Sequence, residues 1–321
     1  MTTSATTRNR YVYGPVHSWR AGTALGIDPI GEHSTCSFNC VYCQLGKIQT
    51  VTTETKIYVP AEYVTEDLRE LEAQGHFNYE DLDVITFAGS GEPTLAKNLG
   101  EMILAIKDLY KNRSKQVPIS ILTNATMFND AEVRKRTLEA DLISLKLDAP
   151  NDEILRAVNQ PAPGITMASI ISGIKALKED LQSRHPEETA GRRKDPPVLQ
   201  LQIMVLPKWI ATSQASPAPR NDEFDYVTSM AKIIKELGIT KLQINTPTRE
   251  KPVSKTGEYW IDTRGNHYSE EQAGHIKPEF IEVKHLPVIT KEEAFAIEDR
   301  LRELLHDTMP ELEIINVYKR G

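Results

Sequence analysis

This sequence has few cysteines, no long apolar run and no excess of positive charge, and each of these absences excludes a class of protein. Only three of its 321 residues are cysteine, and an odd number of thiols argues against a disulfide framework. The longest apolar runs, such as residues 203–206, fall far short of the ~20 residues of a membrane-spanning helix. Residues 1–10 are polar and lack the apolar centre of a signal peptide, so we expect a cytoplasmic protein with no membrane association. The formal net charge of −7 leaves no overall field that would attract a polyanion.

Short strands and amphipathic helices alternate along the chain. Short β-branched or leucine-rich runs predict strands at residues 25–28, 84–88, 119–123, 142–148, 198–206 and 241–245. Between them, apolar residues recur at helical spacing on one face, beginning at Val64, Leu99, Ile170 and Val227, with a weaker helix over 130–140. This alternation predicts an α/β fold with a parallel sheet and helices outside it.

Several of the predicted strands alternate apolar and polar residues. Fully buried parallel strands are usually apolar throughout, yet Gln200, Gln202, Gln243, Lys146 and Asp148 interleave with leucine and isoleucine. We expect the apolar set to face the helices and the polar set to face the interior of a barrel. A polar interior is costly to bury dry, so this pattern predicts either a polar ligand inside the barrel or a solvated face of an open sheet.

The chain divides into three expected parts: an N-terminal tail over 1–15, a core barrel over 16–247 and a C-terminal extension over 248–321. The extension begins with a long polar stretch, 248–278. It continues with a capping-box pattern at residues 290–293, an amphipathic helix and a final strand near Ile314. Two further polar stretches, 184–197 and 209–221, predict long connections. Loops of such length are usually functional or disordered.

All three cysteines lie in one short segment, Cys36-Ser-Phe-Asn-Cys40-Val-Tyr-Cys43. In an α/β barrel, a loop that follows the first predicted strand lies on the catalytic face. Three thiolates can hold three irons of a 4Fe–4S cluster and leave the fourth iron open to a ligand. The alternative is zinc, for which His33 would complete a Cys₃His set. The sequence therefore predicts a metal site at Cys36, Cys40 and Cys43.

This C-x₃-C-x-aromatic-C spacing, placed just after the first strand, resembles the signature of the radical S-adenosylmethionine (SAM) superfamily. The resemblance covers roughly residues 25–247 and implies a partial (βα)6 TIM-like barrel of parallel strands, here with a C-terminal helix-strand extension. It also implies two cofactors, a 4Fe–4S cluster and S-adenosylmethionine. In that superfamily, reductive cleavage of SAM produces a 5′-deoxyadenosyl radical that abstracts hydrogen from a substrate, so a reducing partner such as flavodoxin or ferredoxin is implied as well.

The resemblance extends to individual positions. Tyr42 matches the aromatic residue that packs near the adenine, and residues 89–93 are similar to the Gly-Gly-Glu-Pro motif, with Ser90 in place of a glycine. Polar groups at the ends of later strands match positions that bind the rest of the cofactor. The implied cofactor-binding residues are Tyr42, Gly89, Ser90, Gly91, Glu92, Asn124, Lys146, Asp148 and Asn245. No protein residue is assigned as catalytic.

The strings at 25–29, 43–46 and 89–95 narrow the resemblance to the group that includes wyosine-type tRNA synthases. This implies a tRNA nucleoside as substrate. Two features weaken that implication, because the chain has no cysteine left for a second cluster and its acidic balance lacks the electrostatic footprint of an RNA-binding protein. Modification of a peptide or small metabolite is the alternative, and a non-catalytic zinc module is a third hypothesis.

Overall fold

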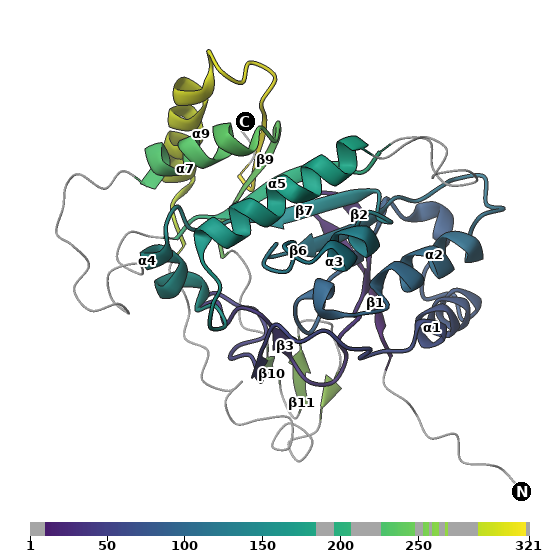
Figure 1. Cartoon of the computed structure of the whole chain (residues 1–321). Helices are drawn as coiled ribbons and strands as arrows, with labels where there is room; N and C mark the ends of the chain where they lie inside the picture. The colour runs from purple at the N-terminus through teal and green to yellow at the C-terminus, as the bar shows by residue number, and fades with distance from the viewer. Residues whose placement is uncertain are drawn as a thin grey trace, which may run out of the picture.

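The structure, a computed structural model, describes residues 10–183, 196–206, 226–247, 253–256, 259–262, 267–268 and 288–318. A curled eight-stranded sheet forms a half-barrel at its centre (Figure 1). In spatial order its strands are β1 (Val12–Ser18), β2 (Gly22–Ile27), β5 (Val84–Phe87), β6 (Ile119–Thr123), β7 (Leu142–Lys146), β8 (Val198–Met204), β9 (Lys241–Asn245) and β13 (Glu313–Asn316). Every neighbouring pair is parallel except β1 with β2. The expected partial TIM-like barrel is confirmed.

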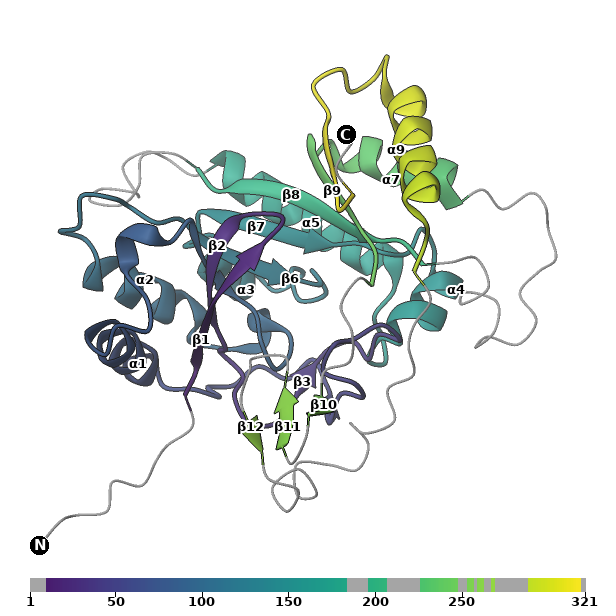
Figure 2. The same cartoon turned by 180° about the vertical axis from the view of Figure 1, so that it is seen from behind.

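Helices cover one face of the sheet. Helix α5 lies in front of the strands in Figure 1, whereas β2 and β8 face the viewer in Figure 2. The six main helices are α1 (Ala61–Ala73), α2 (Leu99–Leu109), α3 (Ala131–Thr137), α5 (Met167–Ser183), α7 (Tyr226–Leu237) and α9 (Lys291–Leu305). Their apolar stripes are buried as predicted, for example Leu99, Ile103 and Ile106 of α2. The capping box that begins α9 is present, since Thr290 and Glu293 exchange hydrogen bonds.

The alternation along the strands separates two faces. Leu145, Leu201 and Ile244 are fully buried in the core beneath the helices. The polar residues share the opposite face, where Ser144 pairs in register with Gln200, and Gln202 with both Lys146 and Gln243. Their side chains bond to one another: Gln200 donates to Ser144, Gln243 to Gln200 (3.1 Å) and Gln202 to Gln243 (3.3 Å). The predicted polar interior is therefore present.

Strand β1 was not expected. It begins at Val12, inside the segment 1–15 expected as a tail, and pairs antiparallel with β2 across a register shift between Tyr13 and Val16. The sequence pattern hides this strand because Gly14 and Pro15 interrupt it, which edge strands tolerate. Strand β7 also ends earlier than expected, at Lys146 instead of 148, because Asp148 turns away to accept a hydrogen bond from the Met204 N–H on β8.

The expected C-terminal extension contributes to the main sheet, since β13 pairs in parallel with β9. Within the stretch 248–278, the described strands β10 (Val253–Thr256), β11 (Tyr259–Asp262) and β12 (His267–Tyr268) form a small antiparallel sheet. The expected connection 209–221 and most of 184–197 lie outside the described residues. In the part of the chain that is described, no helix has the length and apolarity needed to cross a membrane.

Candidate cluster and cofactor site

The cysteine segment forms a folded loop beyond the carboxyl end of β2. Strand β3 (Thr35–Cys36) pairs with β4 (Thr50–Val51), and between them a turn closes as the Cys43 N–H donates to the Cys40 carbonyl (3.0 Å). All three thiols are free and half-buried. The loop therefore presents three thiols, each without a disulfide partner, at the catalytic face of the half-barrel.

Two asparagine side chains donate hydrogen bonds to these sulfurs. The amide nitrogen of Asn124 lies 3.6 Å from the Sγ of Cys36, and that of Asn159 lies 3.3 Å from the Sγ of Cys40. The Phe38 N–H also reaches the Cys36 Sγ at 3.4 Å. Such donors stabilise sulfur that carries negative charge, as a metal-bound thiolate does.

Burial works against ionisation of these thiols when no metal is bound. It raises the pKa of Cys40 to about 12, an effect that Lys146 opposes and that Cys43 and Asp148 reinforce. Burial likewise raises the pKa of both Cys36 and Cys43. A metal supplies the positive charge that such thiolates lack, and it displaces their protons on binding. The three thiols therefore fit a cationic metal group and not an ordinary solvent-exposed nucleophile.

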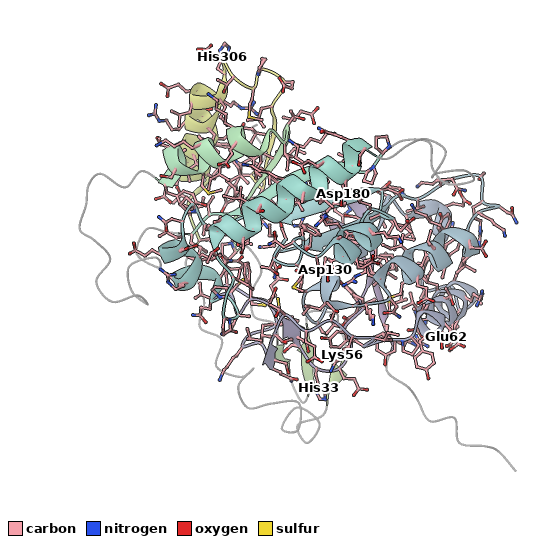
Figure 3. All side chains as sticks on the ribbon, viewed as in Figure 1. His33, Lys56, Glu62, Asp130, Asp180 and His306 are labelled. Atoms are coloured by element: carbon pink, nitrogen blue, oxygen red, sulfur yellow. The ribbon has the colours of Figure 1, made fainter. Side chains whose placement is uncertain are left out.

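The zinc alternative depends on His33 joining the three thiols. Among the described residues, no three histidine, cysteine, aspartate or glutamate side chains converge on a point that one metal ion would occupy. His33, the candidate fourth zinc ligand, is exposed, pairs with Gln49 (3.1 Å) and lies at the outer edge of the molecule in Figure 3. A cubane places each thiolate on a different iron, so it does not need such convergence. Among the described residues, His33 therefore does not complete the Cys₃His set expected for zinc.

The second expected motif, residues 89–92, is joined to the cysteine loop by backbone hydrogen bonds. Thr35 donates to the Ser90 carbonyl (2.9 Å) and accepts from the Glu92 N–H (3.0 Å). A Cβ on Gly91 would lie 1.7 Å from the Thr35 carbonyl oxygen. We expected this glycine to allow close approach to a ligand. The close approach in the structure is to the cysteine loop itself.

Ser90, which departs from the family's glycine, has a partner that the sequence did not reveal. Its hydroxyl donates to Asp28 Oδ2 (2.7 Å) and its N–H to Asp28 Oδ1 (3.1 Å). Asp28 is fully buried and also accepts from the N–H groups of Ile30 and Gly31, both at 3.0 Å. One carboxylate thus connects the end of β2, the start of the cysteine loop and the second motif.

We predict that Ser90→Ala lowers the free energy of unfolding by about 1.5–3 kcal/mol, the usual contribution of a hydrogen bond to a charged group. Urea unfolding of the apoprotein measures this change. Ser114→Ala is the matched control, because the exposed Ser114 hydroxyl also donates to a carboxylate, that of Glu80, at a longer 3.4 Å. Equal losses in the two variants would contradict an anchoring role for the Ser90–Asp28 contact.

The Glu92 carboxylate, expected as a cofactor contact, is occupied by protein donors. It accepts from Thr94 N (3.0 Å), Thr94 Oγ1 (2.7 Å), Thr123 Oγ1 (2.6 Å) and Asn124 N (2.8 Å). Burial raises its pKa, and these hydrogen bonds oppose that rise. Glu92 therefore positions Asn124, whose own amide donates to Ser37 (2.8 Å) and Cys36.

Tyr42, Lys146 and Asp148 come together over the cysteine loop. The Tyr42 hydroxyl donates to Asp148 Oδ2, and the Lys146 Nζ lies 4.5 Å from the centre of the Tyr42 ring. Asp148 is almost fully buried and also accepts from Asn159 (2.8 Å). The Lys146 ammonium lies 3.8 Å from Asp148, so its N–H groups make only a long contact with that carboxylate. Asn159 was missed because nothing in its local pattern marks it.

Asn245, the last expected residue, lies at the end of β9, where its side chain accepts from the N–H of Thr246 (2.9 Å). Two buried atoms near these strand ends have no hydrogen-bond partner within the described chain, Asn159 Oδ1 and Thr246 Oγ1. Such atoms are rare in folded proteins. A bound polar ligand would satisfy them, which is consistent with a cofactor on this face.

Comparison with known proteins agrees with this geometry. The family model of the radical SAM superfamily matches residues 33–182. A UPF0026 protein of Synechocystis sp. is 40% identical over 256 residues, which are 80% of this chain and 81% of that protein. A UPF0026 protein of Methanocaldococcus jannaschii is 30% identical over 237 residues, 74% of this chain and 63% of that protein.

The fold has solved counterparts. A structure of TYW1 with a lysine-pyruvate adduct bound aligns with a TM-score of 0.50 at 13% identity, covering 89% of this chain and 75% of that one. At such low identity the likeness concerns the fold alone. The sequence match to the Synechocystis protein is far stronger, and the superfamily match includes all three cysteines. The chain therefore belongs to the radical SAM superfamily of enzymes and, within it, to the same family as the UPF0026 proteins.

Proposed function

We propose that this enzyme binds a 4Fe–4S cluster through Cys36, Cys40 and Cys43 and uses it to cleave S-adenosylmethionine reductively. When bound, the two cofactors supply a 5′-deoxyadenosyl radical that abstracts a hydrogen atom from the substrate. The observation that carries the proposal is the loop of three free thiols, two of which accept hydrogen bonds from asparagine amides. With no fourth cysteine in the sequence, one iron would keep an open position.

The protein's own groups suit binding of an amino acid moiety beside that loop. The Lys146 ammonium provides N–H donors for a carboxylate, and its contact with Asp148 is long at 3.8 Å. Within the described part of the chain, Asn159 Oδ1 is a buried acceptor without a partner. The Tyr42 ring is held in place by Asp148. We propose that these residues bind and orient S-adenosylmethionine, with Gly89, Ser90 and Gly91 fixing the position of the cysteine loop.

Anaerobic reconstitution tests the cofactor proposal. The protein, loaded with iron and sulfide, is incubated with S-adenosylmethionine and dithionite, and the products are analysed by mass spectrometry. We expect 5′-deoxyadenosine to form slowly without substrate and faster with cell extract. Reduced, fully loaded protein that binds S-adenosylmethionine but never releases 5′-deoxyadenosine would refute the proposal. Flavodoxin and ferredoxin are the proposed physiological reductants, and either one replacing dithionite would support this.

We propose a nucleoside of tRNA as the substrate. The support is the resemblance to wyosine-type tRNA synthases together with the linked side chains of Gln200, Gln202 and Gln243, which are nearly fully buried on the polar face. Each amide has both donor and acceptor atoms, as the edge of a nucleobase requires. The net charge of −7 favours the second candidate, a peptide or a small metabolite, because it offers no general attraction for phosphate.

The substrate proposal predicts tRNA binding that weakens steeply with salt, with a log–log slope of about −0.9 for each duplex phosphate neutralised. Filter binding at several salt concentrations measures the slope. Nucleoside analysis of tRNA from cells with and without the gene gives an independent readout, in which one modified nucleoside should be lost or replaced by its precursor. An unchanged nucleoside profile together with no salt-sensitive binding would shift the assignment to a peptide or metabolite.

A further inference from the structure

A short segment far from the cysteines in sequence runs along the cysteine loop. Residues 158–162 pair with residues 37–41 through backbone hydrogen bonds from Ala162 to Ser37 (2.8 Å), from Asn39 to Asn159 (2.9 Å) and from Val41 to Val158 (2.9 Å). Phe38 and Pro161 form an antiparallel bridge between them. The loop that carries Cys36 and Cys40 is therefore held along its length by this segment, which we call the clamp.

The backbone of the clamp is unusual. Residues Leu155–Asn159 form a π-helical turn, and Gln160 then takes the left-handed conformation with φ of 45°. A non-glycine residue in that region costs about 1–2 kcal/mol, and π-helical turns often occur at functional sites. The side chain of Gln160 accepts from the Asn39 amide (2.8 Å), which helps to hold this conformation. The wide turn brings Asn159 against the cysteine loop.

The Asn159 side chain is the point of contact with sulfur. It is 1% exposed, and its amide nitrogen lies 3.3 Å from Cys40 Sγ, 2.8 Å from Asp148 Oδ2 and 3.1 Å from the Tyr42 hydroxyl. Rotating the amide by 180° would place its oxygen against a carboxylate and a sulfur, so the nitrogen belongs where it is. Asp148 takes one N–H, and the other is directed toward Cys40 and the Tyr42 hydroxyl.

We infer that Asn159 raises the reduction potential of the cluster through its hydrogen bond to Cys40. The inference rests on the proposed function, in which Cys40 is a cluster ligand. One-electron reduction adds a negative charge to the cluster and its sulfurs, and hydrogen bonds to those sulfurs stabilise the reduced form. The bond is buried, where electrostatic effects are stronger than in water. Asn159 acts through Cys40 and is thus a positioning residue.

Asn124 is the weaker of the two sulfur donors. Its amide nitrogen is 3.6 Å from Cys36 Sγ and is shared with the Ser37 hydroxyl at 2.8 Å. At the longer distance the N–H dipole acts less strongly on the sulfur. Asn159 is therefore the residue whose loss should shift the potential most.

The test is Asn159→Leu, which keeps the shape of the side chain and removes the donor. Wild type and variant are reconstituted anaerobically and titrated with dithionite while the reduced cluster is followed by electron paramagnetic resonance. We expect the variant to have a more negative midpoint potential. At a fixed potential, its reduced-to-oxidised ratio should be lower by about tenfold, which is about 59 mV for one electron.

Asn98→Leu is the matched control. Asn98 is also buried (7% exposed) and donates to a backbone carbonyl, that of Val59 (2.9 Å), and its Oδ1 has no partner among the described residues. Its side-chain hydrogen bond goes to Val59 and not to a cysteine sulfur, so this variant should keep the wild-type potential despite a comparable loss of stability.

The outcomes separate the inference from the proposed function. If reconstituted wild-type protein never bound about four irons, both the proposed function and the inference would be refuted. A fully loaded Asn159→Leu variant with the wild-type potential would overturn the inference alone. If that variant loses the cluster, Asn159→Ala, which also removes the donor, takes its place in the titration. Loss of the cluster from both variants, with the thermal unfolding transition retained, would assign Asn159 a purely structural role and also overturn the inference.

Discussion

Replacing any one of Cys36, Cys40 and Cys43 by alanine should reduce the iron and sulfide content of the reconstituted protein by at least about tenfold. Loss of an outer-shell hydrogen bond alone commonly costs 10–100-fold in metal affinity, and loss of a ligand should cost more. The chain has no other cysteine, so no thiol can substitute. Formation of 5′-deoxyadenosine should disappear with the cluster.

Iron and sulfide analysis and the visible absorption of the reconstituted protein check this result. Gln44→Ala is a suitable control, because Gln44 is exposed on the same loop and its replacement removes no sulfur atom. A triple variant in which all three cysteines are replaced, and which still held about four irons, would show that the cluster is bound elsewhere. Wild-type protein that takes up one zinc ion, and no iron, would favour the non-catalytic zinc module.

Gly91→Ala should lower the free energy of unfolding by about 3 kcal/mol or more, at or beyond the upper end of the usual cost of overpacking. The new Cβ would lie 1.7 Å from the Thr35 carbonyl oxygen. That oxygen belongs to the backbone, so no side-chain rotation relieves the clash. The two loops must separate, which breaks the hydrogen bonds of Thr35 with Ser90 (2.9 Å) and Glu92 (3.0 Å). Cluster retention should fall as well.

Urea unfolding measures the stability of this variant, and iron content measures its cluster. Gly75→Ala provides the comparison, because no atom lies within 4 Å of a Cβ placed there and only its φ of +76° opposes a side chain. That strain costs about 1–2 kcal/mol and leaves the cysteine loop untouched. If Gly91→Ala were no more destabilising than Gly75→Ala and kept its cluster, the close packing of the two loops would not be essential.

Local patterns in the sequence were enough to predict the candidate metal site and most of the architecture. The cysteines lie within one loop, so their spacing reports directly on a shared site. The apolar periodicity of a helix or strand likewise depends on neighbours in sequence. Strands β6 and β9 have the bounds that the pattern predicted, and the capping box of α9 is present. Strand β1 escaped prediction because Gly14 and Pro15 disrupt its pattern, and its pairing with β2 is visible only in the tertiary structure.

Contacts between distant segments were decided by the tertiary structure alone. Asn159 is 119 residues from Cys40, and Ser90 is 62 residues from Asp28. An asparagine or aspartate at such a position has no local signature, because its role depends on which buried group the fold brings within hydrogen-bond distance. The glycines at 89 and 91 were visible in the sequence, but the groups they approach, the Asp28 side chain and the Thr35 backbone, were not. Burial makes these few contacts decisive, since a buried polar group that loses its partner keeps the full cost of desolvation.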